Sequence, residues 1–484
     1  MIEKTIEDCL WSNAQLLGEK VAVKSGRSSV TYAELRAQIM AAATFYRSLP
    51  GYDTGKSVII SAGKQLEFLY AYFGAHLVGL QAVPVSEDIN PDRFAYIKAK
   101  LAPLAAVGFD KIDTDVQKVP LASFAGLDCH ASSFVLMPKP QDIADILFTT
   151  GTTGAPKGVP LTYANEYAAA RQINSYIHNA QGDIELLALP VSHSFGLGRL
   201  RCCLMNGQTI ILLGSFANVK KMFRTIEEEH VTGFTMVPAS WKYLQKMVGD
   251  KLSQFAGQLK YIEMGSAFFG EEDKRHLASL FPNTRVTMHY GLTEASRSSF
   301  MEFHEDDANL SSVGKASPEV NIGIFDASGV RLAPGEEGEI CVKGSHVMKG
   351  YLWQDNANTF FGDYFRTGDC GVMTPDGYIY LKSRIKELIN VGGKKVAPTE
   401  VDEQILKIPG VVDCACVGVP DPEGVLGEVV KGCIVKDPSS NVTFAEIGAA
   451  LVGKLEAYKI PVVWQWIEAV PKTHNGKIQR NLLK

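Results

Sequence analysis

The 484-residue sequence lacks the features of several protein classes. Its nine cysteines include no paired C-x-x-C spacing with nearby histidines, so no disulfide framework or zinc site is predicted. The most apolar window, Phe68–Leu80, has only 13 residues and contains His76, which makes it too short to span a bilayer. The formal net charge is −5 and the Lys and Arg residues are scattered, which predicts neither nucleic-acid binding nor a basic membrane-binding surface.

A targeting signal is also lacking. The stretch Met1–Asp8 is acidic and has no continuous apolar run, which argues against a signal peptide. The odd number of cysteines indicates reduced, buried thiols. We therefore expect a cytoplasmic protein without stable membrane insertion. Its length and its 46% hydrophobic content predict a large core divided among about two to four domains.

One loop is rich in threonine and glycine. The apolar stretch Ile146–Phe148 leads into it, and it ends at Lys157, so backbone N–H groups, hydroxyls and an ammonium could converge on a phosphate chain. The Walker pattern is absent, because Gly151 and Gly154 are three residues apart and Gly158 follows the lysine. An ordinary P-loop ATPase is therefore not favoured, and the loop alone is also typical of a surface turn.

Alternating strand and helix patterns predict an α/β fold. Strand 58–61, helix 66–78 and strand 82–85 form a parallel unit with a crossover helix. After Pro318, short alternating runs predict a small β-rich subdomain, and a last unit of about 100 residues follows Lys386. Further strands are expected at 184–189, 209–213, 234–237, 260–264, 411–419 and 429–435, and helices at 197–205, 219–229, 239–248 and 444–455.

Seven stretches, taken in order, resemble the adenylate-forming superfamily of acyl- and aryl-CoA synthetases, peptide-synthetase adenylation domains and beetle luciferases. The resemblance covers essentially the whole chain. It implies an N-terminal AMP-binding domain over 1–384, built of α/β sheets and the small β-rich subdomain, and a small mobile α+β domain over 387–484 with a hinge at Lys386. The stretches are 146–159, 189–196, 289–294, 335–340, 364–369, 383–389 with Gly392–Gly393, and 471–477.

The resemblance implies an enzyme that works in two steps. ATP activates a carboxylic acid to an acyl-AMP with release of pyrophosphate, and the acyl group then passes to the thiol of CoA. A carrier-protein phosphopantetheine is an alternative acceptor, which the sequence leaves open. The implied cofactors are ATP, Mg²⁺ and CoA. A non-catalytic nucleotide-binding protein and a luciferase-like oxygenase are less favoured, since all the catalytic motifs are present and nothing supports oxygenation.

The same likeness assigns the nucleotide site. Tyr290 would lie against adenine, Thr293 would bind the α-phosphate, and Glu294 would bind Mg²⁺, which prefers carboxylate and phosphate oxygens. Asp369 would accept hydrogen bonds from the ribose hydroxyls, and Arg384 would reach the ribose or phosphate, or else form a plain surface salt bridge. The β- and γ-phosphates would be held by Thr149, Thr150, Gly151, Thr152, Thr153 and Lys157.

Four further residues are implied to act in catalysis or in domain movement. Lys477 would bridge a carboxylate oxygen and the α-phosphate in the transition state. His193 would close the acid pocket behind the carboxylate, unless it is a structural histidine. After adenylation, the C-terminal domain would rotate about Lys386 and bring Gly392 and Gly393 to the pantetheine thiol.

The sequence does not identify the acid. The start of the helix after His193 carries no aspartate over Phe195–Arg199, which disfavours an α-amino acid. Arg199 and Arg297 could pair with an anionic group on the substrate or form structural ion pairs. Other expected pocket residues are Phe195, Trp241, Met264, Gly265, Ser266, Met288 and Ser296.

Overall fold

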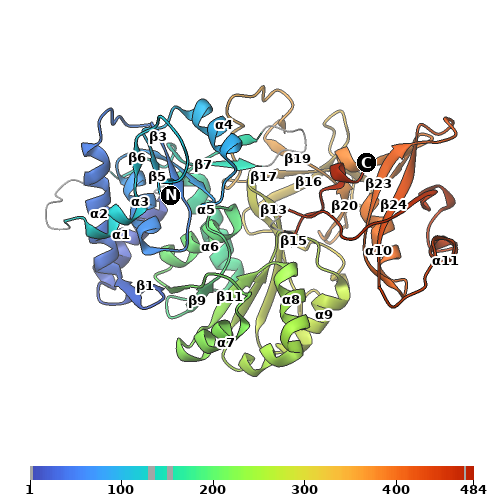
Figure 1. The fold of residues 1–484 in the computed structure, drawn as a ribbon, viewed down its shortest axis with the longest axis horizontal. Coiled ribbons are helices and arrows are strands. Elements are labelled where there is room, and N and C mark those ends of the chain that lie inside the picture. Colours follow the sequence, from blue (N-terminus) through green and yellow to red (C-terminus); the bar gives the residue numbers. More distant parts are fainter. Residues whose placement is uncertain (1–3, 129–136, 150–155, 474–475) are drawn as a thin grey trace. The chain divides into compact units, whose positions relative to one another are not determined.

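The computed structural model describes residues 4–128, 137–149, 156–473 and 476–484, and its chain divides into two compact units. Figure 1 shows the course of the chain from blue to red. No helix among the described residues is long and apolar enough to cross a membrane. Unit 1 is Met1–Leu310, Gly314–Asn321 and Lys343–Phe360, and unit 2 is Ser311–Val313, Ile322–Val342 and Phe361–Lys484.

Unit 1 contains a six-stranded sheet. Strands β3 (Ser57–Ser61) and β4 (Gln81–Val85) pair in parallel across the helix α3 (Leu66–Leu77), which confirms the predicted crossover unit. Only the last strand is antiparallel, since β7 (Ile143–Thr149) pairs with β8 (Lys157–Thr162) as a hairpin. The strand order is β6 (Lys118–Val119), β5 (Ala105–Val107), β3, β4, β7, β8.

A nine-stranded sheet forms the rest of unit 1. Its middle strands run parallel, and an antiparallel pair closes each end. Figure 1 shows α8 and α9 side by side along this sheet, and their apolar faces contribute to its core. The strands, in sheet order, are β15 (Lys315–Ala316), β14 (Ala295–Glu302), β13 (Arg285–Leu292), β12 (Tyr261–Met264), β11 (Gly233–Met236), β9 (Ile184–Leu187), β10 (Thr209–Leu212), β1 (Val21–Ser25) and β2 (Ser28–Thr31).

Capping boxes begin three of the helices of unit 1, whereas the helix predicted over 197–205 begins earlier, at Ser194. The Thr31 side chain accepts a hydrogen bond from the Glu34 backbone N–H, and the Glu34 side chain accepts one from the Thr31 backbone N–H, which together form a capping box. Thr5 and Thr162 cap two further helices in the same way. The helices are α1 (Ile6–Leu16), α2 (Tyr32–Ser48), α3, α4 (Pro91–Leu101), α5 (Tyr163–Ile177), α6 (Ser194–Met205), α7 (Val219–Glu228), α8 (Pro238–Val248) and α9 (Glu271–Leu280).

Unit 2 holds the predicted β-rich part and the last α+β part of the chain. The helix expected over 444–455 ends earlier, at Leu451, because Gly453 takes a left-handed backbone conformation that no helix continues through. The elements are β16 (Asn321–Phe325), β17 (Glu337–Lys343), β18 (Phe360–Phe361), β19 (Tyr364–Met373), β20 (Ile379–Arg384), β21 (Ile389–Val391), β22 (Lys394–Val396), α10 (Pro398–Ile405), β23 (Val411–Pro420), β24 (Glu428–Lys436), α11 (Phe444–Leu451) and β25 (Val463–Trp466).

The predicted hinge residue, Lys386, is exposed in a single 3₁₀ turn, Ile385–Glu387, inside unit 2. The hinge prediction concerns a movement between two arrangements of the chain, and the structure contains one arrangement. The domain boundary near Lys386 therefore stays a prediction.

Candidate active site

The two ends of the threonine-rich loop lie opposite each other. Thr149 ends β7 and Lys157 begins β8, and the two residues are partners in the antiparallel pair. The loop therefore joins two strands, whereas a Walker loop leads into a helix. Thr150, Gly151, Thr152 and Thr153 lie outside the described residues.

Tyr351 connects this loop to the residue predicted to bind metal. The Nζ of Lys157 lies 4.4 Å from the centre of the Tyr351 ring, and the Tyr351 hydroxyl donates a 2.7 Å hydrogen bond to Oε1 of Glu294. The backbone N–H of Met348 donates to the Glu294 carbonyl. One tyrosine thus contacts a cation with its ring and a carboxylate with its hydroxyl.

Close packing fixes the segment that carries Tyr351. The backbone N–H of Leu352 donates to the Gly158 carbonyl at 3.0 Å. A Cβ at Gly158 would lie 2.8 Å from the Trp353 ring, so only glycine allows this approach. Sequence reasoning did not select Tyr351, and no local pattern could have found it, because its partner Glu294 is 57 residues away.

Thr293 and Glu294 form the turn between β13 and β14. Leu292 pairs with Ala295, so the two-residue connection presents both side chains at one end of the sheet. The Ser194 hydroxyl, at the start of α6, lies 3.3 Å from the Thr293 hydroxyl. Tyr290 is half-buried on β13 just before the turn. Hydroxyls and a carboxylate are therefore gathered where a phosphate could bind.

His193 precedes α6 as its N-cap residue and is exposed. It is therefore not a buried core histidine, which was the structural alternative. Its proposed role at the substrate carboxylate stays a prediction.

The carboxylate of Glu294 suits a hard cation. The residue is 7% exposed, and one of its oxygens accepts the bond from Tyr351. No group of three or more potential metal-binding side chains occurs within the part of the chain that the structure describes. A single carboxylate such as that of Glu294 is a common protein ligand of Mg²⁺, together with substrate phosphates.

Arg297 is buried in an ion pair. Its Nε lies 3.2 Å from Oε1 of Glu263, its Nη2 donates to the Phe195 carbonyl, and its guanidinium lies 4.7 Å from the Phe195 ring centre. Burial acts to raise the pKa of Glu263, but Arg297 and His289 outweigh it and hold that pKa at about 2. The protein itself thus provides the carboxylate partner that the sequence left open.

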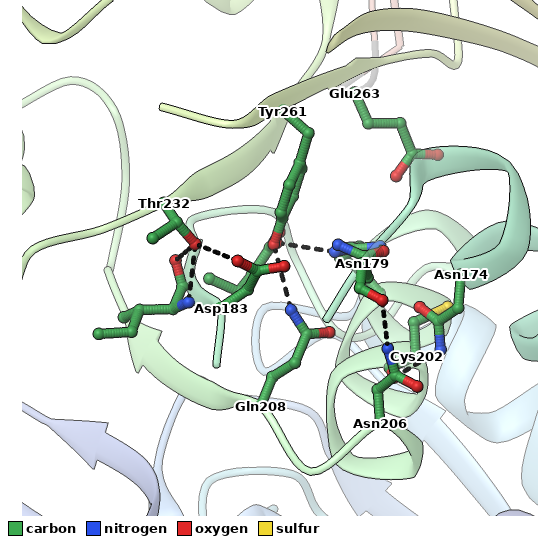
Figure 2. A network of polar contacts seen from close by, with 12 residues as sticks. Asn174, Asn179, Asp183, Cys202, Asn206, Gln208, Thr232, Tyr261 and Glu263 are labelled. Carbon is green, nitrogen blue, oxygen red and sulfur yellow. Dashed lines mark hydrogen bonds and ion pairs between the residues drawn. The ribbon is translucent and has the colours of Figure 1, made fainter. Parts of the chain in front are cut away.

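Arg199 is paired in the same manner. Its Nη2 lies 3.0 Å from Oε2 of Glu185, and its Nη1 donates to the Asn179 side chain. Figure 2 shows polar side chains of this region, among them Asn179, Gln208 and Tyr261. Gln208 donates to the Tyr261 hydroxyl at 3.4 Å, and this hydroxyl donates to Glu185. Both arginines therefore form structural ion pairs, which was one of the two alternatives that the sequence left open.

The other expected pocket residues divide into two groups. Gly265 lies against His289, since a Cβ at this glycine would be 2.1 Å from the imidazole. Ser266, next to it, has a positive φ of 74°, which a non-glycine residue seldom adopts. Trp241, Met264 and Met288 belong to the hydrophobic core of the nine-stranded sheet.

A pocket opens beside Thr293. It is lined by side chains of α5, α6 and the turn after β13, and by the buried His346. Burial lowers the pKa of His346 to about 4. Two charged residues that sequence reasoning did not select, Glu166 and Arg201, also line it. In the sequence, each is a charged residue within a helix, and its burial is visible only in the structure.

In unit 2, β19 and β20 bring Asp369 and Arg384 together. The two residues are directly opposite in register, and Nε of Arg384 lies 2.8 Å from Oδ1 of Asp369. Gly368 has a positive φ of 72° and donates its backbone N–H to Glu339. Arg384 therefore forms a salt bridge, as one alternative predicted, and its partner Asp369 is buried. A contact between Arg384 and the ribose stays a prediction.

Lys477 is exposed on a tight hairpin. Its backbone N–H donates to the Thr473 hydroxyl at 3.1 Å, and the Thr473 N–H donates to the Lys477 carbonyl. Three residues later, Arg480 is buried and anchors this segment. Its Nη2 lies 2.7 Å from Asp402 and its Nε 3.1 Å from Glu387.

Gly392 and Gly393 form the two-residue turn between β21 and β22. Both have positive φ, 57° and 88°, which a type I′ hairpin requires and glycine allows without strain. The Gly392 N–H donates to the Leu426 carbonyl at 2.9 Å. The turn is thus fixed by a neighbouring loop of the same unit.

Comparison with known proteins gives two family matches. The model of the AMP-binding enzyme family matches residues 10–352, and that of the AMP-binding enzyme C-terminal domain matches residues 400–477. Among curated relatives, the 2-succinylbenzoate–CoA ligase of Bacillus licheniformis is 27% identical, covering 98% of this chain and 98% of the relative.

Solved structures are similar over the whole chain. ATP-bound MatB from Rhodopseudomonas palustris has a TM-score of 0.89 at 25% identity, covering 99% of this chain and 98% of that one. The o-succinylbenzoate CoA synthetase MenE from Bacillus subtilis, in complex with ATP and magnesium ion, has a TM-score of 0.87 at 26% identity, covering 98% of both chains. The same enzyme in complex with the acyl-adenylate OSB-AMP has a TM-score of 0.87 at 25% identity, covering 100% and 99%.

Proposed function

The chain belongs to the AMP-binding enzyme family, and from this membership we propose how its residues divide the reaction. It is an AMP-forming acid–CoA ligase. It activates a carboxylic acid with ATP to an acyl-AMP, releases pyrophosphate, and passes the acyl group to CoA. Its cofactors are ATP, Mg²⁺ and CoA. The acid is a small carboxylic acid, and the relatives named for succinylbenzoate make aryl acids the first candidates.

The arrangement around Tyr351 carries the assignment of the nucleotide site. Lys157, Tyr351 and Glu294 form one contact series, and Thr293 lies beside Glu294 with its hydroxyl near Ser194. Lys157 would bind the β- and γ-phosphates together with Thr149, Thr150, Gly151, Thr152 and Thr153. Glu294 would hold Mg²⁺, which when bound neutralises phosphate charge.

In the adenylation step, a carboxylate oxygen of the acid forms a bond to the α-phosphorus, and the bond from that phosphorus to the pyrophosphate oxygen breaks. Thr293 and Lys477 would stabilise the negative charge on the α-phosphate oxygens. Tyr290 would hold adenine, Asp369 and Arg384 the ribose, and His193 and Phe195 the acid.

In the second step, the CoA thiol attacks the acyl carbon and AMP leaves. We propose that the C-terminal domain over 387–484 rotates about Lys386 between the steps, so that Lys477 withdraws and the Gly392–Gly393 turn replaces it. The turn presents no side chain beyond hydrogen, which suits the passage of a narrow pantetheine arm.

A carrier-protein phosphopantetheine remains the second candidate acceptor, because its thiol has the same chemistry as that of CoA. The cytoplasm is the proposed compartment. The eight cysteines that the structure describes form no disulfide among themselves, and seven of them are buried, as in proteins kept reduced.

Two assays test the function. A panel of carboxylic acids should include one that supports ATP–pyrophosphate exchange, and the same acid with CoA should yield a thioester and AMP. If the adenylate accumulates and only a carrier protein is acylated, the second acceptor is correct. If no acid in a broad panel supports exchange, the proposed function is wrong.

A further inference from the structure

We propose that His289 closes the inner end of the acid pocket and thereby limits this enzyme to short carboxylic acids. This inference rests on the proposed function and deepens it, because it assumes an acid that is activated near Thr293 with its tail beside Phe195.

The start of α6 and the turn after β13 mark where the acid enters. The hydroxyls of Ser194 and Thr293 lie 3.3 Å apart, and Thr293 is the residue proposed to bind the α-phosphate. Phe195, which is expected to line the acid pocket, follows Ser194 in the first turn of α6 and is 7% exposed. An acid whose carboxylate attacks that phosphate is therefore placed to extend its tail along the Phe195 ring.

His289 occupies the space beside that ring. It lies on β13, four residues before Thr293, and its ring centre is 4.6 Å from that of Phe195, with the two rings nearly perpendicular at 87°. The imidazole also lies against Gly265, the residue after β12, since a Cβ at this glycine would be 2.1 Å from it. The room that Gly265 leaves by having no side chain is therefore taken by His289 and is not open to an acid.

Two charged residues hold the imidazole in this position. Nδ1 of His289 lies 2.7 Å from Oε1 of Glu263, and the same oxygen lies 3.2 Å from Nε of Arg297. The Arg297 guanidinium is in turn 4.7 Å from the centre of the Phe195 ring. His289, Glu263 and Arg297 are 9%, 0% and 2% exposed. Moving the imidazole aside would break a contact with a buried carboxylate, which is costly.

The backbone around Arg297 is adapted to this arrangement. Arg297 has a φ of 53°, in the left-handed region that favours glycine, so its conformation is strained. A Cβ at Gly198 of α6 would lie 2.7 Å from Nη1 of Arg297, and the missing side chain of Gly198 thus gives the guanidinium its place. Protein side chains therefore take up the space between α6 and β13 that a long acid would need.

The position of His289 along β13 sets the length of the acid. A strand rises about 3.3 Å per residue, so the Cα atoms of His289 and Thr293 are at most about 13 Å apart. The phosphate, the substrate carboxylate and the imidazole each take part of this length. We therefore expect saturated acids no longer than hexanoic acid and, among aryl acids, those with the carboxylate directly on the ring.

The first test compares acids that differ in length. The full-length enzyme is assayed by acid-dependent ATP–pyrophosphate exchange with straight-chain acids from acetic to dodecanoic acid, and with benzoic, phenylacetic and 3-phenylpropionic acids. In the series that the enzyme accepts, kcat/KM should be highest at or below hexanoic acid, or at benzoic acid, and should fall about tenfold or more per further methylene group. A maximum at octanoic acid or a longer acid, or at 3-phenylpropionic acid, overturns the inference but leaves the ligase function standing, whereas no exchange with any acid removes both.

A pair of variants assigns the limit to His289. His289→Ala should raise kcat/KM about tenfold or more for an acid two carbons longer than the best wild-type acid. Thr287→Ala is the matched control, because Thr287 is buried on the same face of β13 but two residues farther from Thr293, so this variant removes volume behind His289 and should keep the wild-type maximum. An unchanged maximum in His289→Ala, or the same shift in Thr287→Ala, would contradict the role of His289.

A binding measurement makes the test independent of turnover. Non-hydrolysable N-acylsulfamoyl adenosines of increasing chain length are titrated into the wild type and both variants by calorimetry, and the chain length of the tightest ligand should increase only in His289→Ala. Equal losses of affinity for short and long chains would mean that His289 merely supports the fold. Glu263 keeps Arg297 as its partner in this variant. If the alanine variant does not fold, His289→Asn, which is shorter and still offers Glu263 a hydrogen bond, takes its place with the same expected shift.

Discussion

At the scale of single residues, Tyr351 has an unusual position, because its ring and its hydroxyl serve different partners. The ring faces the Lys157 ammonium and the hydroxyl binds the Glu294 carboxylate. We infer that Tyr351 positions two groups that bind the nucleotide without contacting the reacting atoms itself.

Tyr351→Phe should weaken binding of the metal–ATP complex about tenfold, because Glu294 loses a charge-assisted hydrogen bond. The measurement is titration with Mn²⁺ and ATP, followed by electron paramagnetic resonance of the free ion. Tyr351→Leu should weaken ATP further, since the ring beside Lys157 is lost as well. Tyr243→Phe is the control, because the hydroxyl of this exposed tyrosine donates to the Ala217 carbonyl, away from Lys157 and Glu294. Unchanged Mn²⁺ binding in Tyr351→Phe would remove the positioning role.

His346 makes a prediction about acid stability. It is 2% exposed, Ser298 is its hydrogen-bond partner, and burial lowers its pKa from 6.5 to about 4. A histidine with a lowered folded-state pKa favours folding above its unfolded pKa, and this contribution is lost as pH falls from about 6.5 to about 4. The loss amounts to roughly 3 kcal/mol at most.

His346→Gln should therefore show a flatter decrease in the free energy of unfolding over this pH range than the wild type, measured by urea denaturation at each pH. Ser298→Ala keeps the titrating histidine and should keep the wild-type slope. A glutamine variant as sensitive to acid as the wild type would mean that His346 does not control this range.

Some residues of the candidate site could be predicted from the sequence, and others could not. Thr293, Glu294, Asp369 and Lys477 stand in local motifs whose order is readable along the chain. Tyr351, Glu166 and Arg201 could not be found in this way, because their partners come from other elements. Pairing of buried charges is a property of the packed core, and periodicity contains no information about it.

At the scale of elements, periodicity predicted most strands and helices, because an apolar face repeats every two or every 3.6 residues. The crossover from β3 through α3 to β4 was readable for that reason. The end of α11 was wrong by four residues, since apolar residues continue to Leu455 although Gly453 breaks the helix.

A buried arginine anchors the segment that follows the hairpin carrying Lys477. Arg480 reaches α10 through Asp402, the turn near Lys386 through Glu387, and β23 through the Cys416 carbonyl. Since Asp402 is 95% buried, removal of the arginine would leave its charge uncompensated.

Arg480→Met should lower the free energy of unfolding of the C-terminal part by about 3–5 kcal/mol, the range found when one partner of a buried ion pair is removed. Adenylation should also decrease, because the Lys477 hairpin loses its anchor. Lys472→Met is the matched control, since it breaks the more exposed pair with Asp413, and should cost about 1 kcal/mol or less. Thermal and urea denaturation measure the free energy of unfolding of both variants. An equal decrease in the two variants would show that Arg480 is not the anchor.

At the scale of the whole molecule, the proposed active residues divide between the two compact units. Lys157, Thr293 and Glu294 belong to unit 1, whereas Lys477 and the Gly392–Gly393 turn belong to unit 2. The two half-reactions should therefore respond differently to changes in unit 2.

Lys477→Ala should reduce ATP–pyrophosphate exchange by about 10²–10³-fold, as expected for one group that stabilises transition-state charge. It should leave thioester formation from supplied acyl-AMP and CoA near the wild-type rate. Gly392→Val should show the reverse pattern, because a side chain at a positive φ strains the turn and narrows the thiol path. If both variants impaired both half-reactions equally, the domain over 387–484 would not alternate between two roles.

The buried ion pairs described around α6 also constrain how this enzyme can acquire a new substrate. Arg199, Arg201 and Arg297 each have a carboxylate partner on a different element, Glu185, Asp145 and Glu263. A single substitution at any of these positions removes one partner of a buried ion pair, so it is penalised before it can improve the fit of another acid. Evolution of specificity here must pass through coupled changes at two positions, and a mutant library that varies arginine and carboxylate together should yield active enzymes that single-site libraries miss.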